Sequence, residues 1–233
     1  TPEHARRAIV SSPVLSHSKF QQLQSVDLPG FESETIDLNY AESEGLEAAI
    51  LRVCKQAEAA VSAGRSQLVL SDRNIRENYL PINALMATGA VHHYLIKVGL
   101  RCDCNLIVET AVARDAHHFA VLLGFGATAV YPYLAYDIIA DMARSGEILG
   151  DPLEAQAYFR KGIDKGLLKI LSKMGISTVA SYRGAQLFEA VGLNREVVDL
   201  CFKGVPSRIQ GAGFAELEVD QRLLSADAWR ARK

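Results

Sequence analysis

The sequence has little of three features that would each assign it to a class of protein. Its 25 Lys and Arg residues do not outnumber its 27 Asp and Glu residues, so it lacks the basic excess that holds a nucleic-acid backbone. No apolar run reaches the roughly 18 residues that a membrane-spanning helix needs, and the first residues lack the apolar segment of a secretory signal. We therefore expect no nucleic-acid partner, no membrane partner and a cytoplasmic location.

Cysteine is scarce and poorly spaced for its common structural roles. The chain has four cysteines, and none forms a C-x-x-C pair. Zinc sites favour such pairs, and disulfide frameworks need denser spacing in shorter chains. The sequence therefore predicts reduced, mostly buried thiols that bind no metal.

The chain is instead rich in apolar residues that follow two alternating periods. Its 233 residues are 49% hydrophobic, which suits one α/β domain or two small ones. Short β-rich runs alternate four times with helix-period segments, at a spacing of about 30 residues. This alternation predicts right-handed crossovers. The predicted fold is α/β, with about four βα units forming a half-barrel-like parallel sheet, followed by a helical C-terminal layer.

The predicted elements are set by glycine, proline and capping residues. The expected strands cover 35–38, 67–70, 105–109 and 127–131. The expected helices of the core run from an N-cap at Ser43 to Gly64, from Pro81 to Gly99, over 112–123, and from Pro132 to Arg144. After Gly150 we expect no strand, but helices over 152–174, 182–191 and 195–202. The chain then divides into an arm over 1–34, a parallel α/β core over 35–150, a helical layer of the same domain over 151–203, and a linker over 204–233.

Polar side chains follow three of the predicted strands. Ligands of parallel α/β folds bind beyond the carboxyl ends of the strands. The residues at these ends are Ser71, Asp72, Arg73, Glu109, Thr110 and Tyr131. They either converge on a small polar ligand or pair with one another and cap helices.

Two histidine pairs and one glycine pair carry weaker signals. His92-His93 and His117-His118 each point in two directions on a helix, so a metal site would need one histidine from each pair. The alternative is that one member of each pair is buried and hydrogen-bonded. Gly124-Phe125-Gly126 lacks the third glycine of a dinucleotide loop, so it indicates a chain turn.

A basic stripe near the C-terminal third is the most specific block. Lys165, Lys169 and Lys173 recur every four residues, and Ser177 and Arg183 follow in a turn. Such a helix–turn–helix surface suits a carboxylate-rich or phosphate-bearing partner; the alternative is a solvated face with good capping.

Around this block the chain resembles the central domain of the glutamate synthase large subunit. The resemblance rests on residues 165–193 and extends over nearly the whole chain. The segments that agree in order are 12–16, 70–73, 89–93, 108–109, 124–127, 131–135 and 206–209.

The resemblance implies a role inside a multidomain iron–sulfur flavoprotein. In that family an amidotransferase domain releases ammonia from glutamine, and a tunnel carries it to an FMN-bearing (β/α)8 domain. There 2-oxoglutarate is reductively aminated to glutamate, with electrons from an NADPH-oxidising small subunit or from ferredoxin. The central domain links the two catalytic domains, and residues 204–233 would lead towards the FMN domain. This chain has Thr1 rather than a nucleophilic cysteine and no cysteine trio, so we expect the FMN, the iron–sulfur cluster and all catalytic residues to lie elsewhere.

The resemblance and the strand-end pattern together give seven candidates for interdomain or tunnel-wall contacts: Ser71, Asp72, Arg73, Glu109, Lys173, Ser177 and Arg183. Strand-end polar groups would keep a tunnel wall hydrated, and Arg183→Ala would uncouple glutaminase from synthase turnover. A second interpretation is a stand-alone small-molecule-binding or catalytic α/β domain that uses Asp72, Glu109 and His117 or His118. A third is a pure protein-interaction module, which an exposed apolar patch would mark.

Overall fold

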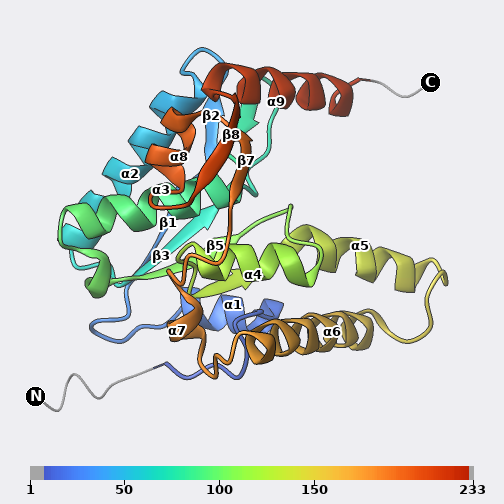
Figure 1. Ribbon diagram of the computed structural model, residues 1–233. Helices are drawn as coiled ribbons and strands as arrows, with labels where there is room; N and C mark the ends of the chain where they lie inside the picture. Colours follow the sequence, from blue (N-terminus) through green and yellow to red (C-terminus); the bar gives the residue numbers. More distant parts are fainter. Residues whose placement is uncertain (1–7, 231–233) are drawn as a thin grey trace, which may run out of the picture.

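The computed structural model describes residues 8–230 and shows a four-stranded parallel sheet at its centre (Figure 1). The sheet contains β1 (Ser33–Asp37), β3 (Gln67–Ser71), β5 (Asn105–Glu109) and β6 (Ala129–Tyr131) in that order. Each crossover therefore moves one strand further in the same direction, as in a barrel wall and unlike a doubly wound sheet. The predicted half-barrel-like α/β fold is confirmed. Thr1 lies outside the described residues.

The strands are apolar along their length because both faces of the sheet are covered. Leu68, Leu70 and Leu106 pack into one core with α2 (Leu46–Ser62) and α3 (Ala84–Lys97). Val69 and Ile107 lie in a second cluster with residues of α1 (His17–Gln24) and α5 (Tyr133–Arg144). Every residue of β3 is buried as a result.

A helical layer closes the lower half of the molecule in Figure 1. Helix α6 (Pro152–Lys173) packs against α4 (Ala116–Gly124) and α5. Asp151 caps α6 by accepting the backbone N–H groups of Leu153 and Glu154, at 2.8 and 3.1 Å. The 22-residue helix confirms the expectation over 152–174 almost residue for residue. No helix of the described chain is long and apolar enough to span a bilayer.

The N-terminal arm pairs with the outer edge of β6. Val14 forms a parallel bridge with Val130, in which Leu15 N donates to Val130 O at 2.9 Å and Val130 N donates to Pro13 O at 2.8 Å. Both Val14 and Leu15 are buried. The arm therefore belongs to the folded core.

Three core helices begin later than predicted. Helix α2 begins at Leu46 behind Gly45, so Ser43 is not its N-cap. Pro81 ends a short strand, β4 (Tyr79–Pro81), which pairs antiparallel with β2 (Asn39–Ala41), and α3 begins behind Asn83. Helix α4 begins at Ala116 because Asp115 accepts the N–H groups of His117 and His118. In each case the local sequence is also compatible with the earlier helix start. The observed start is set instead by pairing with a segment distant in sequence or by a better capping residue.

The prediction that no strand follows Gly150 is wrong. β7 (Ala190–Leu193) and β8 (Ser207–Ala212) form a parallel pair around α8 (Arg195–Cys201), while α7 is only Val179–Tyr182. The two strands meet through glycines: a Cβ on Gly211 would overlap the Gly192 carbonyl oxygen. Glycine weakens the sequence signal for a strand, which explains the miss.

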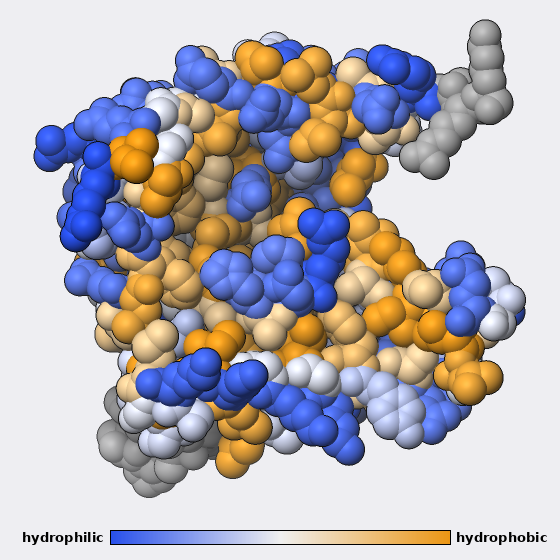
Figure 2. Space-filling model, turned by 45° about the vertical axis from the view of Figure 1, so that its right-hand side comes forward, coloured by the Kyte–Doolittle hydropathy of each residue, from blue (hydrophilic) through white to orange (hydrophobic). Residues whose placement is uncertain are grey.

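The described part of 204–233, predicted as a linker, is a strand and a helix packed on the core. α9 (Phe214–Ala228) buries Phe214 against the α2–α3 core. Its Glu218 accepts the Leu46 N–H at 2.5 Å, and its Arg222 pairs with Glu42 at 2.5 Å. Figure 2 shows that the surface is hollowed between the part carrying α9 and the part carrying α5, with polar and apolar side chains on both walls.

Candidate functional site

The candidate site is a row of polar residues at the carboxyl edge of the parallel sheet. The strand register pairs Asp37 with Ser71, Ser71 with Glu109, and Glu109 with Tyr131. Carboxyl ends of neighbouring parallel strands meet at one edge, so these four side chains are brought together by the fold itself. Asp37 was missed by the sequence analysis, although the same strand-end rule applied to the first strand would have found it.

Glu109 is the most fully engaged member of the row. Ser71 Oγ donates to Glu109 Oε2 at 2.7 Å, and Arg73 Nη1 lies 3.2 Å from Oε1. The Glu109 side chain is 7% exposed, whereas that of Arg73 is 46% exposed. The carboxylate of Glu109 is therefore neutralised inside the protein, and Arg73 is the member of the pair that is exposed at the surface.

Arg73 also touches residues of the next helix. Its guanidinium carbon lies 4.8 Å from the centre of the Tyr133 ring, and Nη2 lies 3.9 Å from Asp137. Tyr133 is the first residue of α5, which follows β6 directly, and Asp137 lies one turn further along the same helix. Neither was singled out as a contact by sequence, because an arginine–ring contact across a sheet edge leaves no local pattern.

Asp72 is buried behind this row. It accepts the Thr110 hydroxyl at 2.5 Å and the Ala111 N–H at 3.0 Å. Burial raises the pKa of its carboxyl above the ordinary value, although these hydrogen bonds act in the opposite direction. Burial, and next the neighbouring Asp72, raises the pKa of the Tyr133 hydroxyl, which has no hydrogen-bond partner within residues 8–230.

Four of the seven predicted contact residues are thus assembled, and three lie elsewhere. Ser71, Asp72, Arg73 and Glu109 form the strand-end cluster. Lys173 is the exposed last residue of α6, and Ser177 lines an apolar cavity of about 310 Å³ beside it. Arg183 follows α7, and its Nε is buried.

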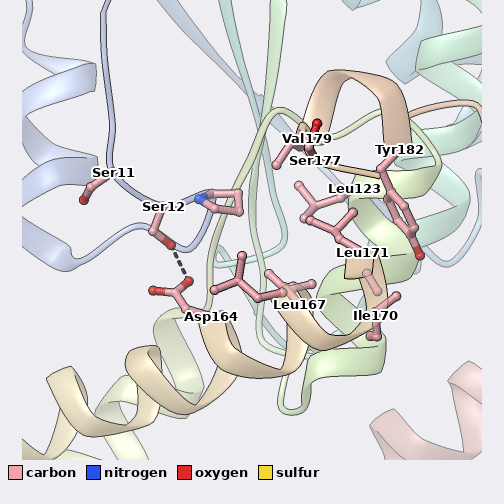
Figure 3. Close-up of a pocket in the computed structure, with 13 residues that line it drawn as sticks. Ser11, Ser12, Leu123, Asp164, Leu167, Ile170, Leu171, Ser177, Val179 and Tyr182 are labelled. Carbon is pink, nitrogen blue, oxygen red and sulfur yellow. Dashed lines mark hydrogen bonds between the residues drawn. The ribbon is translucent and has the colours of Figure 1, made fainter. Parts of the chain in front are cut away.

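The cavity beside Ser177 is largely hydrophobic. Figure 3 shows Leu123 of α4 and Leu167, Ile170 and Leu171 of α6 lining it, with Val179 and Tyr182 of α7. Its polar edge is the hydrogen bond from Ser12 Oγ to Asp164 Oδ1, 2.5 Å long. Because it lies between helices, it is separate from the strand-end cluster.

The histidines do not complete a pocket with Asp72 and Glu109. His118 Nδ1 accepts the Arg114 N–H at 3.2 Å, and His117 is exposed at the start of α4. No hydrogen bond or ion pair within residues 8–230 joins either histidine to Asp72 or Glu109. In the same part of the chain, no three His, Cys, Asp or Glu side chains are placed to hold a metal ion.

The chain is similar in sequence to known proteins along most of its length. Residues 1–194 match the family described as the glutamate synthase central domain. The chain is 41% identical over 222 residues to glutamate synthase (NADH) of Schizosaccharomyces pombe, covering 92% of this chain and 10% of that protein. It is also 41% identical over 230 residues to the glutamate synthase (NADPH) large chain of Bacillus subtilis, covering 99% of this chain and 14% of that protein.

A plant relative and one solved structure complete the comparison. Ferredoxin-dependent glutamate synthase 1 of Arabidopsis thaliana is 41% identical over 230 residues, covering 93% of this chain and 14% of that protein. A mandelate oxidase variant matches with a TM-score of 0.48 and 16% identity, over 68% of this chain and 39% of that one. The chain thus spans only 10 to 14% of the length of these glutamate synthases. From its match to the family and this identity over nearly its whole length, the chain belongs to the glutamate synthase central domain family.

Proposed function

We propose that this chain is the linking domain of a larger glutamate synthase, which holds an amidotransferase domain and an FMN domain at a fixed separation. In that enzyme, ammonia from glutamine is channelled to the reductive amination of 2-oxoglutarate to glutamate. The enzyme is an oxidoreductase of nitrogen assimilation that acts in the cytoplasm, with electrons from an NADPH-oxidising subunit or from ferredoxin. The chain alone is inactive in this proposal.

The observation that carries the proposal is the internal pairing of the strand-end cluster. Both oxygens of Glu109 and both oxygens of Asp72 accept hydrogen bonds from groups of this chain. A carboxylate that is already paired is a poor general base. Only Arg73 is substantially exposed, so the cluster suits a contact with a neighbouring domain better than chemistry on a substrate.

The described residues do not fit the cofactors of the proposed parent enzyme. The strand ends, where a flavin phosphate would bind in a barrel, carry the carboxyl groups of Asp72 and Glu109 and an arginine that is already ion-paired. Three of the four cysteines, Cys54, Cys104 and Cys201, are buried, and none belongs to a metal-holding group among the described residues. We therefore place the FMN and the iron–sulfur cluster in other parts of the longer protein.

Replacing Arg73 with glutamine in the full-length enzyme is expected to uncouple its two reactions. The variant removes the exposed charge of the cluster, so the contact with the adjoining domain weakens while both active sites remain intact. We expect glutamate formed per glutamine hydrolysed to fall about three- to tenfold. Parallel assays of glutaminase and synthase turnover measure this ratio.

Arg195→Gln is the matched control, because that side chain is 81% exposed and its ion pair within residues 8–230 is with Asp199 on its own helix. Thermal unfolding shows whether the Arg73 variant remains folded. An unchanged ratio in a folded Arg73→Gln enzyme would show that the strand-end cluster takes no part in coupling. The sequence suggests Arg183→Ala as the test of coupling by the strand-end groups. Arg73 is the better position for that test, because Arg183 lies apart from the strand ends.

Adding FMN to the isolated 233-residue chain is expected to give no binding. The proposal assigns the flavin to another domain, so flavin fluorescence and the melting temperature stay unchanged in a sample whose circular dichroism shows it to be folded. Quenched fluorescence with a rise in melting temperature would favour a stand-alone ligand-binding domain instead.

A further inference from the structure

A group of basic side chains gathers away from the strand ends, between α3, the end of α4 and the loop after α7. It consists of His92, His93, Arg101, Arg183 and Lys203. Its two histidines, with Lys203 and Gln186, line a cavity of about 50 Å³. A liquid water molecule takes about 30 Å³, so the cavity has room for a small oxyanion group and not for a nucleotide.

Arg101 fixes the tautomer of His92, a residue that lines this cavity. The Arg101 Nε–H donates to His92 Nδ1 at 2.8 Å, so the single proton of the neutral ring sits on Nε2. Burial, and next the charge of Arg101, lowers the pKa of His92 to about 3. The other Arg101 nitrogens donate to the carbonyl oxygens of Cys104 and Gly126, at 2.7 and 2.9 Å. Carbonyl groups satisfy these donors but do not neutralise the charge.

Arg183 stands beside this cavity, because the next residue, Gly184, lines it and donates its N–H to the Gly124 carbonyl oxygen at 2.9 Å. Arg183 lies near enough that its charge lowers the pKa of both His92 and Arg101. Its own Nε is buried without a hydrogen-bond partner in the described part of the chain, and burial lowers its pKa. Lys203 lies close enough to His93 to lower the pKa of that ring.

No carboxylate within residues 8–230 balances these charges. The ion pairs in this part of the chain involve none of Arg101, Arg183 and Lys203. Neighbouring cations that are partly removed from water and lack a counter-charge destabilise a fold, and a bound anion removes that cost. The loop beside the cavity is also held in an uncommon form, since Gln186 has a φ of 54°.

We propose that this cavity is an oxyanion site, in which His92 Nε2–H and Lys203 bind a carboxylate or phosphate group, while Arg183, next to the cavity-lining Gly184, adds positive charge beside it. The group belongs either to a small free anion or to an acidic side chain elsewhere in the longer protein. The turn before Arg183 was predicted from sequence to meet a carboxylate-rich or phosphate-bearing partner. In the structure, Arg183 lies next to Gly184, which lines the same cavity as His92. This inference is independent of the proposed linking role.

Titration calorimetry of the 233-residue chain with inorganic phosphate, and separately with acetate, tests the proposal. Sodium chloride keeps the ionic strength constant. We expect saturable binding that Arg183→Gln and Lys203→Gln each weaken about ten- to a hundredfold. The matched control is Arg230→Gln, because that side chain is 75% exposed beyond the end of α9. Lys203 is exposed, so its variant still tests the site even if the Arg183 variant does not fold.

Two outcomes overturn the proposal: no saturable binding by the wild-type chain, or equal binding by the wild type and the Lys203 and Arg183 variants. Repeating the titration on the longer protein separates the two sources of the anion. Phosphate binding that persists there assigns the site to a free anion. Binding that is lost there assigns it to an acidic side chain of the same protein.

Discussion

Replacing Gly89 with alanine is expected to destabilise the domain by about 3 kcal/mol. Gly89 lies in α3 where that helix crosses the end of α8, and an added Cβ would overlap the carbonyl oxygen of Cys201. A backbone carbonyl has no rotamer into which it can withdraw, so the two helices must separate. The gain of about 1 kcal/mol in helix propensity on replacing glycine by alanine offsets only part of this cost.

Gly162→Ala is the matched control for this prediction. Gly162 also lies inside a helix, α6, but nothing lies within 4 Å of an added Cβ. Its replacement is therefore expected to stabilise the domain by about 0.5 to 1 kcal/mol. Urea unfolding of both variants measures the difference. If both substitutions stabilise the domain, the close approach of α3 and α8 is not present in solution.

Replacing His92 with glutamine is expected to make the domain less sensitive to acid. The pKa of His92 lies at about 3 in the folded protein, against an ordinary value of 6.5. Above pH 6.5 the ring is neutral in both the folded and unfolded states, and its contribution to stability is fully present. As the pH falls from 6.5 to about 3, the unfolded chain binds the proton first and this contribution is lost. Glutamine removes this loss and still offers Arg101 an acceptor.

The expected size of this effect is about 2 to 4 kcal/mol between neutral pH and pH 3, after allowance for partial solvent screening. The measured quantity is the difference in unfolding free energy between variant and wild type at a series of pH values. His117→Gln serves as the control, because His117 is exposed. A difference that does not change with pH would contradict a buried neutral His92.

The core strands could be predicted from sequence because each is short, apolar and buried on both faces. β5 has the predicted bounds, and β3 extends one residue beyond its prediction. Helix ends were less predictable where two local structures suit the same residue. Pro81 fits both the first turn of a helix and an edge strand, and only its pairing with Asn39 decides between them.

The candidate site likewise has a part that could be predicted from sequence and a part that could not. Ser71 and Glu109 could be placed together because strand ends follow from the parallel sheet alone, and the register confirms that they are neighbours. Lys173, Ser177 and Arg183 are close in sequence, but the end of α6 and the turn through α7 send them to different surroundings. Arg183 adjoins Gly184, which lines the same cavity as His92, a residue from much earlier in the chain, and no local pattern reports such proximity.

The pairing of the N-terminal arm with β6 bears on how the sheet avoids self-association. The outer edge of an open sheet exposes N–H and C=O groups that can recruit a strand from a second molecule. Here residues Pro13 to Leu15 occupy part of that edge, so the chain supplies its own terminating segment. Proteolytic removal of the segment before α1 would expose a template for polymerisation without cutting any helix. The arm thus covers part of the open sheet edge, and a truncated version of this domain should begin no later than Ser12.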